Sequence, residues 1–491
     1  MDLASLPYAV RAIAGLTLLF SLYQLYFHLT TGAARRTLRR TKGTRPAPWI
    51  AGFSDHVFGW ALFRANERCH ATAANTFRMV NLGRHVHFTI EPENLKCIQA
   101  TDHKKWGLGR RRIAGFTPLL GAGIFTTDGA AWAHSREVLR PNFVRSQVRD
   151  LGVLEAHVRA LVDGLPGDGS EVDLGGWFFR LTMDSATEFL FGESTHSLTR
   201  PADSGFATAF GRSQDYIGEL SRYGVFAPLL ISRQKRAQFN QDRAFVHNFV
   251  DTYVRKGLAK RPLLLSQDEK SDPTQRYVFI DELVRQTPDP IRIRSELLNI
   301  LLAGRDTTAS LLTNLWFVLS HRPDIWAALQ AEIAPLAHQP PTFDQLKDLK
   351  YLKALLNESL RLHPVVPANS REALEDTTLP RGEVVVWSLY AMHRRPDYYG
   401  PDAESFKPER WLDDPVTGQK GLRPGWEFLP FNGGARICLG QQFALTEAAY
   451  VTLRLAQAFA RVEGRGSGVW TEGLTLTCVN LEGARVGLWR R

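Results

Sequence analysis

The chain has 491 residues, of which 44% are hydrophobic and 22% charged, and its 60 basic and 50 acidic residues give a formal net charge of +10. Residues 1–45 hold seven basic residues and one acidic residue, so +6 lies there and only +4 on the rest. That mild charge, without basic–aromatic interleaving, argues against nucleic-acid binding. The four cysteines have no paired spacing, which excludes a disulfide framework or a zinc motif and fits a cytosolic catalytic body.

The N-terminal segment Leu6–Leu29 is mostly apolar. As a helix it would span about 36 Å, enough for a hydrocarbon core of about 30 Å. A basic cluster follows it directly, so the positive-inside rule places the downstream chain in the cytoplasm. A cleaved signal peptide, with small residues at 30–34, is the alternative, but its charge would precede the apolar run. We therefore predict a transmembrane anchor with a basic stop-transfer segment over residues 1–45, a hinge at Pro46 and Pro48, and a catalytic domain over 46–491.

A helical run over Ala130–Leu139 carries Trp132 and Arg136 four residues apart, so both side chains can point the same way. An indole N–H and a guanidinium together suit recognition of a carboxylate. Upstream, the triplet 110–112, three arginines, is predicted to be a solvated loop cluster. Short strands are predicted near Val86–Ile90 and Val384–Leu389.

The long apolar stretch Ile293–Leu319 is predicted to be a helix that contains Ala303-Gly304-Arg305-Asp306-Thr307-Thr308. Glycine inside a helix costs about 1 kcal/mol relative to alanine, and a threonine hydroxyl can compete for the carbonyl four residues back. The pattern therefore predicts a helix opened in its middle, with a hydroxyl and a carboxylate beside the opening. Such a pair can relay protons. A kink with solvated polar residues is the plainer interpretation.

Glu358 and Arg361 share one face of a helix predicted over Tyr351–Leu362. Alone they would be an ordinary solvated pair. Arg371, in Pro367-Ala-Asn-Ser-Arg371, and the later segment Phe406–Trp411 carry further cations.

Cys438 lies in the segment Phe431-Asn-Gly-Gly-Ala-Arg-Ile-Cys438-Leu-Gly440, directly before an amphipathic run over Gln441–Phe459. A sulfur at a helix N-terminus faces unpaired N–H groups, which favour the thiolate. The glycines allow a flat group to approach the backbone. This pattern suits an axial ligand of haem iron, whereas a buried structural cysteine is the alternative.

From about Trp49 onward the chain resembles the cytochrome P-450 haem-thiolate monooxygenases, and most closely the fungal alkane and fatty-acid hydroxylases. The matching stretches are Gly121–Gly129, Ala303–Thr308, Met392–Arg395, Leu429–Gly434 and Leu439–Glu447. The resemblance implies haem b with Cys438 as metal ligand, Asp306 and Thr307 as catalytic residues, and a buried cluster of Glu358, Arg361 and Arg410. It implies further cofactor-binding residues: Trp132, Arg136, Arg371, Phe431, Gly434, Arg436 and Gly440.

The resemblance also implies one large, mainly α domain with small β-sheets, behind the N-terminal transmembrane helix. Long amphipathic runs and the lack of repeats or linkers after Trp49 agree with this fold. One departure stands between Gly382 and Val384, where those relatives carry a longer glycine-rich insertion that is missing here.

The function predicted is a monooxygenase of the endoplasmic reticulum membrane, single-pass with a cytosolic catalytic domain, that hydroxylates an unactivated C–H bond. No flavin or nicotinamide motif occurs, so electrons are expected from NADPH–cytochrome reductase. The missing insertion favours a polyketide-like or other lipophilic secondary metabolite of a fungal pathway as substrate. The motif matches favour terminal hydroxylation of fatty acids or alkanes instead. A haem-thiolate isomerase or dehydratase, or a haem sensor, are the remaining alternatives, and the Asp306–Thr307 pair argues against an isomerase.

Overall fold

The computed structural model describes residues 15, 17–19, 21–22, 75–81, 84–143, 151–200, 205–223, 227–266, 277–336 and 339–491. Nearly all of the predicted anchor and the whole hinge lie outside these residues, although 15, 17–19 and 21–22 are helical. Among the residues described, no helix is both long and apolar enough to cross a membrane.

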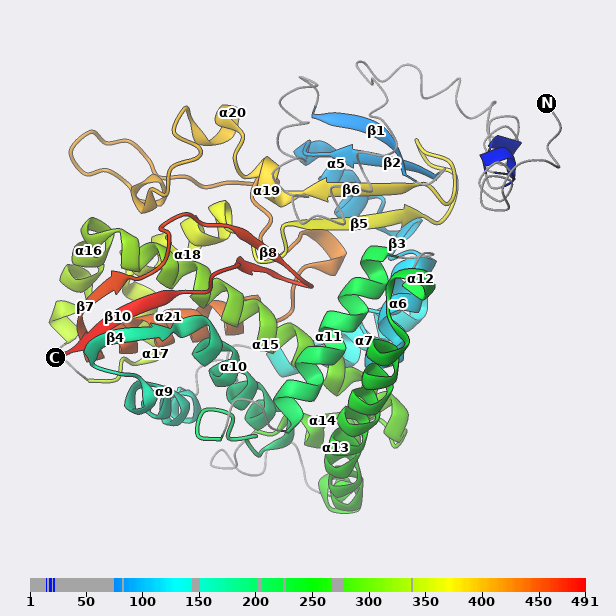
Figure 1. Cartoon of the computed structure of the whole chain (residues 1–491), viewed down its shortest axis with the longest axis horizontal. Coiled ribbons are helices and arrows are strands. Elements are labelled where there is room, and N and C mark those ends of the chain that lie inside the picture. The colour runs from blue at the N-terminus through cyan, green and yellow to red at the C-terminus, as the bar shows by residue number, and fades with distance from the viewer. Residues whose placement is uncertain are drawn as a thin grey trace, which may run out of the picture.

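The fold is mainly helical, with small sheets, as the sequence predicts (Figure 1). The longer helices are α6 (Arg110–Leu120), α7 (Gly129–Leu139), α9 (Gly152–Gly164), α10 (Leu174–Phe191), α11 (Phe206–Tyr223), α13 (Arg233–Ser266), α14 (Phe279–Gln286), α15 (Pro290–His321), α16 (Pro323–Ile333), α18 (Lys350–Leu362) and α21 (Gln441–Ala458). The short helices are α5 (Pro92–Lys96), α12 (Ala227–Leu230), α17 (Phe343–Asp348), α19 (Leu389–Met392) and α20 (Pro396–Tyr399). Single turns are η2 (Cys97–Thr101), η3 (His103–Lys105), η4 (Arg140–Phe143), η6 (Ala334–Leu336), η7 (Pro408–Trp411) and η8 (Gly434–Arg436).

The largest sheet has the strand order β1-β2-β6-β5-β3 and lies beside the helical body (Figure 1). Its strands are β1 (Thr76–Asn81), β2 (Arg84–Thr89), β3 (Trp106–Gly107), β5 (Ala368–Ala373) and β6 (Val384–Ser388). The two strands predicted from sequence are β2 and β6, which pair in parallel with Val86 opposite Val384. A three-stranded sheet, β4 (Asp168–Asp173), β10 (Arg485–Arg490) and β7 (Phe459–Gly464), and a hairpin of β8 (Glu472–Leu474) and β9 (Cys478–Asn480) complete the strands described.

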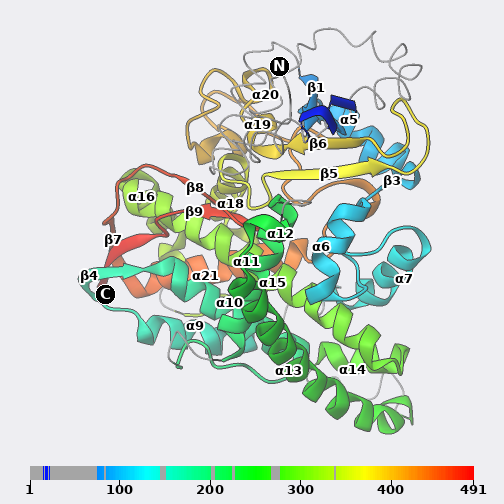
Figure 2. The ribbon, with the colours of Figure 1, turned by 45° about the vertical axis from the view of Figure 1, so that its right-hand side comes forward.

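Helix α15 runs through the centre of the helical body, as two views of the ribbon show (Figures 1 and 2). It begins where the Asp289 carboxylate accepts the backbone N–H groups of Ile291 and Arg292, with Pro290 at the first turn. The buried apolar residues of α15 up to Leu301 belong to one apolar cluster. The buried apolar residues from Ala309 onward belong to a second cluster. The segment 302–308, which carries the motif Ala303–Thr308, therefore lies at the boundary between two cores.

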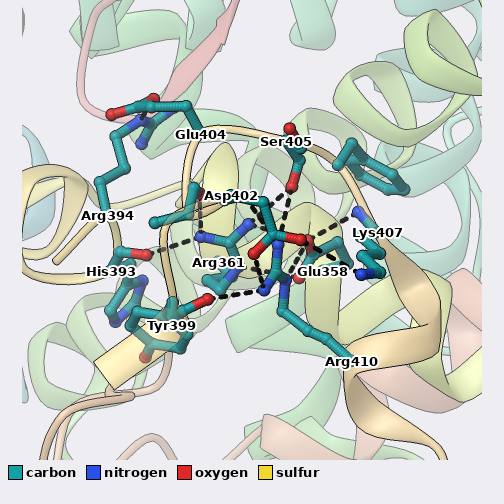
Figure 3. A network of polar contacts seen from close by, with 12 residues as sticks. Glu358, Arg361, His393, Arg394, Tyr399, Asp402, Glu404, Ser405, Lys407 and Arg410 are labelled. Atoms are coloured by element: carbon teal, nitrogen blue, oxygen red, sulfur yellow. Dashed lines mark hydrogen bonds and ion pairs between the residues drawn. The ribbon is translucent and has the colours of Figure 1, made fainter. Parts of the chain in front are cut away.

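A buried ionic cluster holds α18 against the segment that follows α20 (Figure 3). Glu358 forms two hydrogen bonds of 2.8 Å with Arg361 and a third of 3.2 Å with Arg410, and none of the three side chains is more than 7% exposed. The Glu358 carboxylate also accepts the N–H groups of the Lys407 backbone and the Trp411 indole. The predicted contact between the two segments is confirmed, and it is enclosed rather than solvated.

Candidate functional site

Cys438 lies between the turn η8 and helix α21, in a loop that closes on itself. The Cys438 backbone N–H donates to Phe431 O at 2.9 Å, and Ile437 N–H donates to Gly434 O at 3.2 Å. Gly434 has a φ of +60°, a conformation that glycine adopts without strain. Phe431 packs against the apolar cluster that contains α15 from Ala309 onward, and Gly440 directly precedes α21.

The electrostatics of Cys438 differ from the sequence prediction. Burial raises the pKa of its thiol, and the Gly440 N–H and the Arg136 guanidinium oppose this only in part. The loop alone therefore does not produce a thiolate, although coordination by a metal would deprotonate it. The Cys438 side chain is nevertheless exposed. Its sulfur is therefore accessible to a group that binds from outside the loop.

Two predicted residues on α7 reach this loop. Arg136 donates to Ile437 O at 2.9 Å, and its guanidinium lies 5.9 Å from the Trp132 ring. Arg436 lies over the same ring at 4.2 Å and forms an ion pair of 2.7 Å with Asp128. Trp132, Arg136 and Arg436 are thus brought together around Cys438, as expected for carboxylate-binding residues.

Two further arginines complete this cationic group. Arg371, on β5, is buried, and burial together with the nearby charges of Arg112 and Arg436 lowers its pKa to about 9. The prediction that residues 110–112 form a solvated loop cluster holds for the exposed Arg110 and Arg111 but was wrong about the loop and about Arg112. They form the first turn of α6, and Arg112 points inward, donating to Asn369 Oδ1 at 2.9 Å.

The arginine cluster, defined as Arg112, Arg136, Arg371 and Arg436, carries more charge than the protein balances. Among the described residues, Asp128 is the one carboxylate that acts on Arg112, Arg371 and Arg436. The buried Nε of Arg112 has no hydrogen-bond partner among them. Buried guanidinium groups need anionic partners, so the cluster fits an anionic ligand.

The motif on α15 lies in the middle of an uninterrupted helix, so the predicted opening is not a break in helical structure. Thr307 Oγ1 donates to Ala303 O at 2.7 Å, which is the predicted competition for the i−4 carbonyl. Asp306 is buried and forms a 2.8 Å ion pair with Arg305. Burial raises the pKa of the Asp306 carboxyl, and Arg305 opposes this.

Gly304 and Cys438 both border the boundary between the two cores. A Cβ on Gly304 would meet only the Ala186 methyl group, at 3.8 Å. Residues 302–305 and Thr307 remain partly exposed although α15 is central in the body. Leu439 packs on one apolar cluster and Leu445 on the other. The structure thus supplies an exposed sulfur beside a group of arginines, which suits a metal cofactor that carries anionic groups.

Comparison with known proteins agrees with this arrangement. The family model for cytochrome P450 matches residues 47–471. The chain belongs to the cytochrome P450 family. The cytochrome P450 monooxygenase FPY7 of Fusarium mangiferae is 39% identical over 98% of this chain and 97% of its own length. The cytochrome P450 monooxygenase himC of Aspergillus japonicus is 43% identical over 85% of this chain and 77% of its own. Cytochrome P450 52A12 of Debaryomyces hansenii is 44% identical, covering 80% of each.

Family membership and the named relatives make the chain an oxidoreductase, a haem-dependent monooxygenase. Cytochromes P450 bind haem through an axial cysteine thiolate, take electrons from a redox partner and act on lipophilic substrates. The residues present fit such a group: an accessible cysteine next to four arginines. The sequence did not predict the roles of Arg112 and Asp128. For Arg112 the reason is that nothing local distinguishes an inward arginine on α6 from its exposed neighbours.

Proposed function

We propose that Cys438 is the axial thiolate of this cytochrome P450. Trp132, Arg136, Arg371 and Arg436 then hold the haem carboxylates, together with Arg112, while Phe431, Gly434 and Gly440 shape the loop. The observation that supports this most directly is the excess of buried positive charge beside an accessible cysteine. Two carboxylates would offset most of that excess.

When bound, haem supplies the binding and reductive activation of dioxygen. The protein's part is to deliver protons from helix α15. Asp306 is suited to hold a proton because burial raises its pKa. Thr307 keeps its hydroxyl beside Gly304 through the hydrogen bond to Ala303 O. Arg305 links Asp306 to Gln214 on α11, since its Nη1 donates to both side chains at 2.8 and 3.0 Å.

For the substrate, we propose a lipophilic secondary metabolite, polyketide-like in character, hydroxylated at an unactivated C–H bond. Support comes from the connection between β5 and β6, which is short and closed by its own hydrogen bonds. Ala373 N–H donates to Glu383 O at 2.9 Å, and Gly382 N–H returns to Ala373 O at 2.8 Å. The longer glycine-rich insertion of the relatives is missing from this connection, which spans residues 374–383. Terminal hydroxylation of fatty acids or alkanes is the second candidate, favoured by the 44% identity to cytochrome P450 52A12.

We also propose that the catalytic domain, residues 46–491, is held on the endoplasmic reticulum membrane by a single transmembrane helix within residues 1–45. The apolar run Leu6–Leu29 and the basic residues after it support this. NADPH–cytochrome reductase in the same membrane would supply the electrons. Such an anchor also suits substrates that partition into lipid.

The test begins with microsomes that contain the full chain and the reductase. Cys438→Ser should yield folded protein without the thiolate-type spectrum of the reduced carbon-monoxide complex, whereas Cys97→Ser, at an exposed cysteine, should keep it. A thiolate-type spectrum in Cys438→Ser would refute the ligand. Product analysis with fatty acids, alkanes and polyketide-like compounds then separates the two substrate candidates.

A further inference from the structure

We propose that Gln99 is a positioning residue for the thiolate loop, setting the geometry of Cys438 from outside the loop. This inference rests on the proposed ligation by Cys438. Gln99 is 97% enclosed, with an exposed fraction of 3%, and its Oε1 accepts the backbone N–H of Gly433 at 2.9 Å. Gly433 lies five residues before Cys438 inside the closed loop.

The turn that carries Gln99 has an unusual form. Residues Cys97–Thr101 make a π-helical turn, in which Asp102 N–H donates to Cys97 O at 2.9 Å. Such turns are rare and recur at functional sites because they redirect side chains that a regular helix would point elsewhere. Ile98 on the same turn belongs to the apolar cluster that contains Leu429, just before the loop. The turn is therefore fixed against the segment that enters the loop.

The backbone of Gln99 makes a second contact. A Cβ on Gly434 would lie 2.0 Å from Gln99 O and 2.9 Å from the Ala100 Cα. The loop therefore packs flush against the π-helical turn, at a distance that only glycine permits. On another side of the loop, a Cβ on Gly433 would lie 2.7 Å from the Trp426 ring. The pair Gly433–Gly434 is held between the turn and an indole.

The pair Gly433–Gly434 is connected to Cys438 by the hydrogen bonds of the loop. Gly434 O accepts from Ile437 N–H at 3.2 Å, and Phe431 O accepts from Cys438 N–H at 2.9 Å. Gly434 is itself an acceptor in this loop and Gly433 lies between the two acceptors, so we expect a shift of either glycine to reorient Cys438. The amide orientation is also defined, because only the oxygen of Gln99 can accept the Gly433 N–H. The acceptor at position 99 is thus the feature to test.

The experiment compares three variants of the full chain with the unsubstituted protein. Gln99→Leu removes the acceptor, Gln99→Glu keeps an oxygen at the same position, and Gln457→Leu removes a buried amide elsewhere, near the end of α21. The readouts are the share of thiolate-type spectrum in the reduced carbon-monoxide complex and the reduction potential at equal haem content. Loss of one buried hydrogen bond corresponds to about five- to tenfold in an equilibrium constant. We expect a rise of that size in the thiol-to-thiolate ratio of Gln99→Leu, with recovery in Gln99→Glu and no change in Gln457→Leu.

Each outcome bears on the proposal. An unchanged spectrum and potential in Gln99→Leu would overturn it. If Gln99→Leu retains no haem, Gln99→Glu provides the test. A restored thiolate spectrum in Gln99→Glu supports the role of the acceptor. A spectrum no better than that of Gln99→Leu overturns it. An unsubstituted protein without any thiolate-type spectrum would instead refute the ligation by Cys438, and the inference with it.

Discussion

The carboxylate of Asp128 lies 2.7 Å from the guanidinium of Arg436 and also accepts the backbone N–H of Leu108, at 3.0 and 2.9 Å from its two oxygens. Asp128 therefore joins the segment before α6 to the Cys438 loop. Burial, the largest cause, lowers the pKa of Arg436 to about 10, so the guanidinium stays charged near neutrality. One carboxylate thus serves several buried cations, which leaves positive charge for a bound anion.

The first prediction concerns Arg112, which sequence reasoning assigned to solvent. Arg112→Ala removes one cation from the arginine cluster, and a hydrogen bond to a charged group contributes about 1.5–3 kcal/mol. We expect haem to dissociate at least about tenfold faster from this variant. Transfer of haem to an excess of apoglobin measures the rate. Arg110→Ala is the matched control, because Arg110 lies in the same turn of α6 but is exposed. This variant should release haem at the normal rate. Equal rates in the two variants would contradict the inward role of Arg112.

The second prediction concerns proton delivery along α15. Thr307 and Thr313 each donate a hydroxyl to the carbonyl four residues back, at 2.7 and 2.8 Å, but Thr307 is partly exposed whereas Thr313 is buried. Thr307→Ala should lower the amount of product formed per NADPH, while substrate binding is retained. A general acid or base contributes about 10²–10⁴-fold, so Asp306→Asn should slow turnover within that range. Thr313→Ala should affect stability alone. If Thr313→Ala lowers the amount of product per NADPH as much as Thr307→Ala does, helix geometry and not the Thr307 hydroxyl is responsible.

The third prediction concerns the ionic cluster of Figure 3. Glu358→Gln leaves Arg361 enclosed without its counter-charge, while Arg410 keeps its ion pair with Asp402. Breaking a buried pair in this way costs about 3–5 kcal/mol. Urea denaturation measures the loss. Asp324→Asn is the control, since its pair with Arg322 is exposed and such pairs contribute about 0–1 kcal/mol. Similar losses in both variants would mean that the Glu358 cluster is only a local contact.

The sequence predicts the elements that obey a local rule. The apolar pattern over Ile293–Leu319 defines α15, and the structure extends it only to Pro290 and His321. The contact of Glu358 with Arg410 came from the family resemblance, because no spacing rule joins residues so far apart. Trp132 and Arg136 could be grouped from their helical spacing, and the structure confirms that both reach the Cys438 loop.

Features that depend on tertiary environment could not be predicted. Arg112 differs from Arg110 only in the direction that α6 gives it once it packs beside β5. The thiol of Cys438 was expected to be acidified by a helix N-terminus, but desolvation outweighs the Gly440 N–H and Arg136. Gln99 carries no motif, since its role depends on a π-helical turn and two distant glycines.

The last prediction concerns Glu447, a carboxyl enclosed between α21, α10 and α15. Its Oε1 accepts the Ser185 hydroxyl at 2.5 Å, and its Oε2 has no hydrogen-bond partner in the part of the chain that is described. Burial raises the pKa of the Glu447 carboxyl to about 7, although contacts with Ser185 and Thr308 act in the opposite direction. The folded protein thus holds this proton more tightly than the unfolded chain does. The resulting stability is present below the ordinary glutamate pKa near 4.5 and is lost as the pH rises through about 7.

Glu447→Gln cannot ionise, so the free energy of unfolding of the variant minus that of the unsubstituted protein should rise between pH 4.5 and 7 and then level off. A pKa difference of this size corresponds to about 3 kcal/mol. Urea denaturation at pH 5, 6, 7 and 8 measures the difference, in which all other titrating groups cancel. Glu193→Gln is the control: Lys256 lowers the pKa of this exposed carboxyl, so its removal cannot produce a gain across the same window. A flat difference for Glu447→Gln would mean that the carboxyl is ionised in the folded protein, with a partner that offsets its burial.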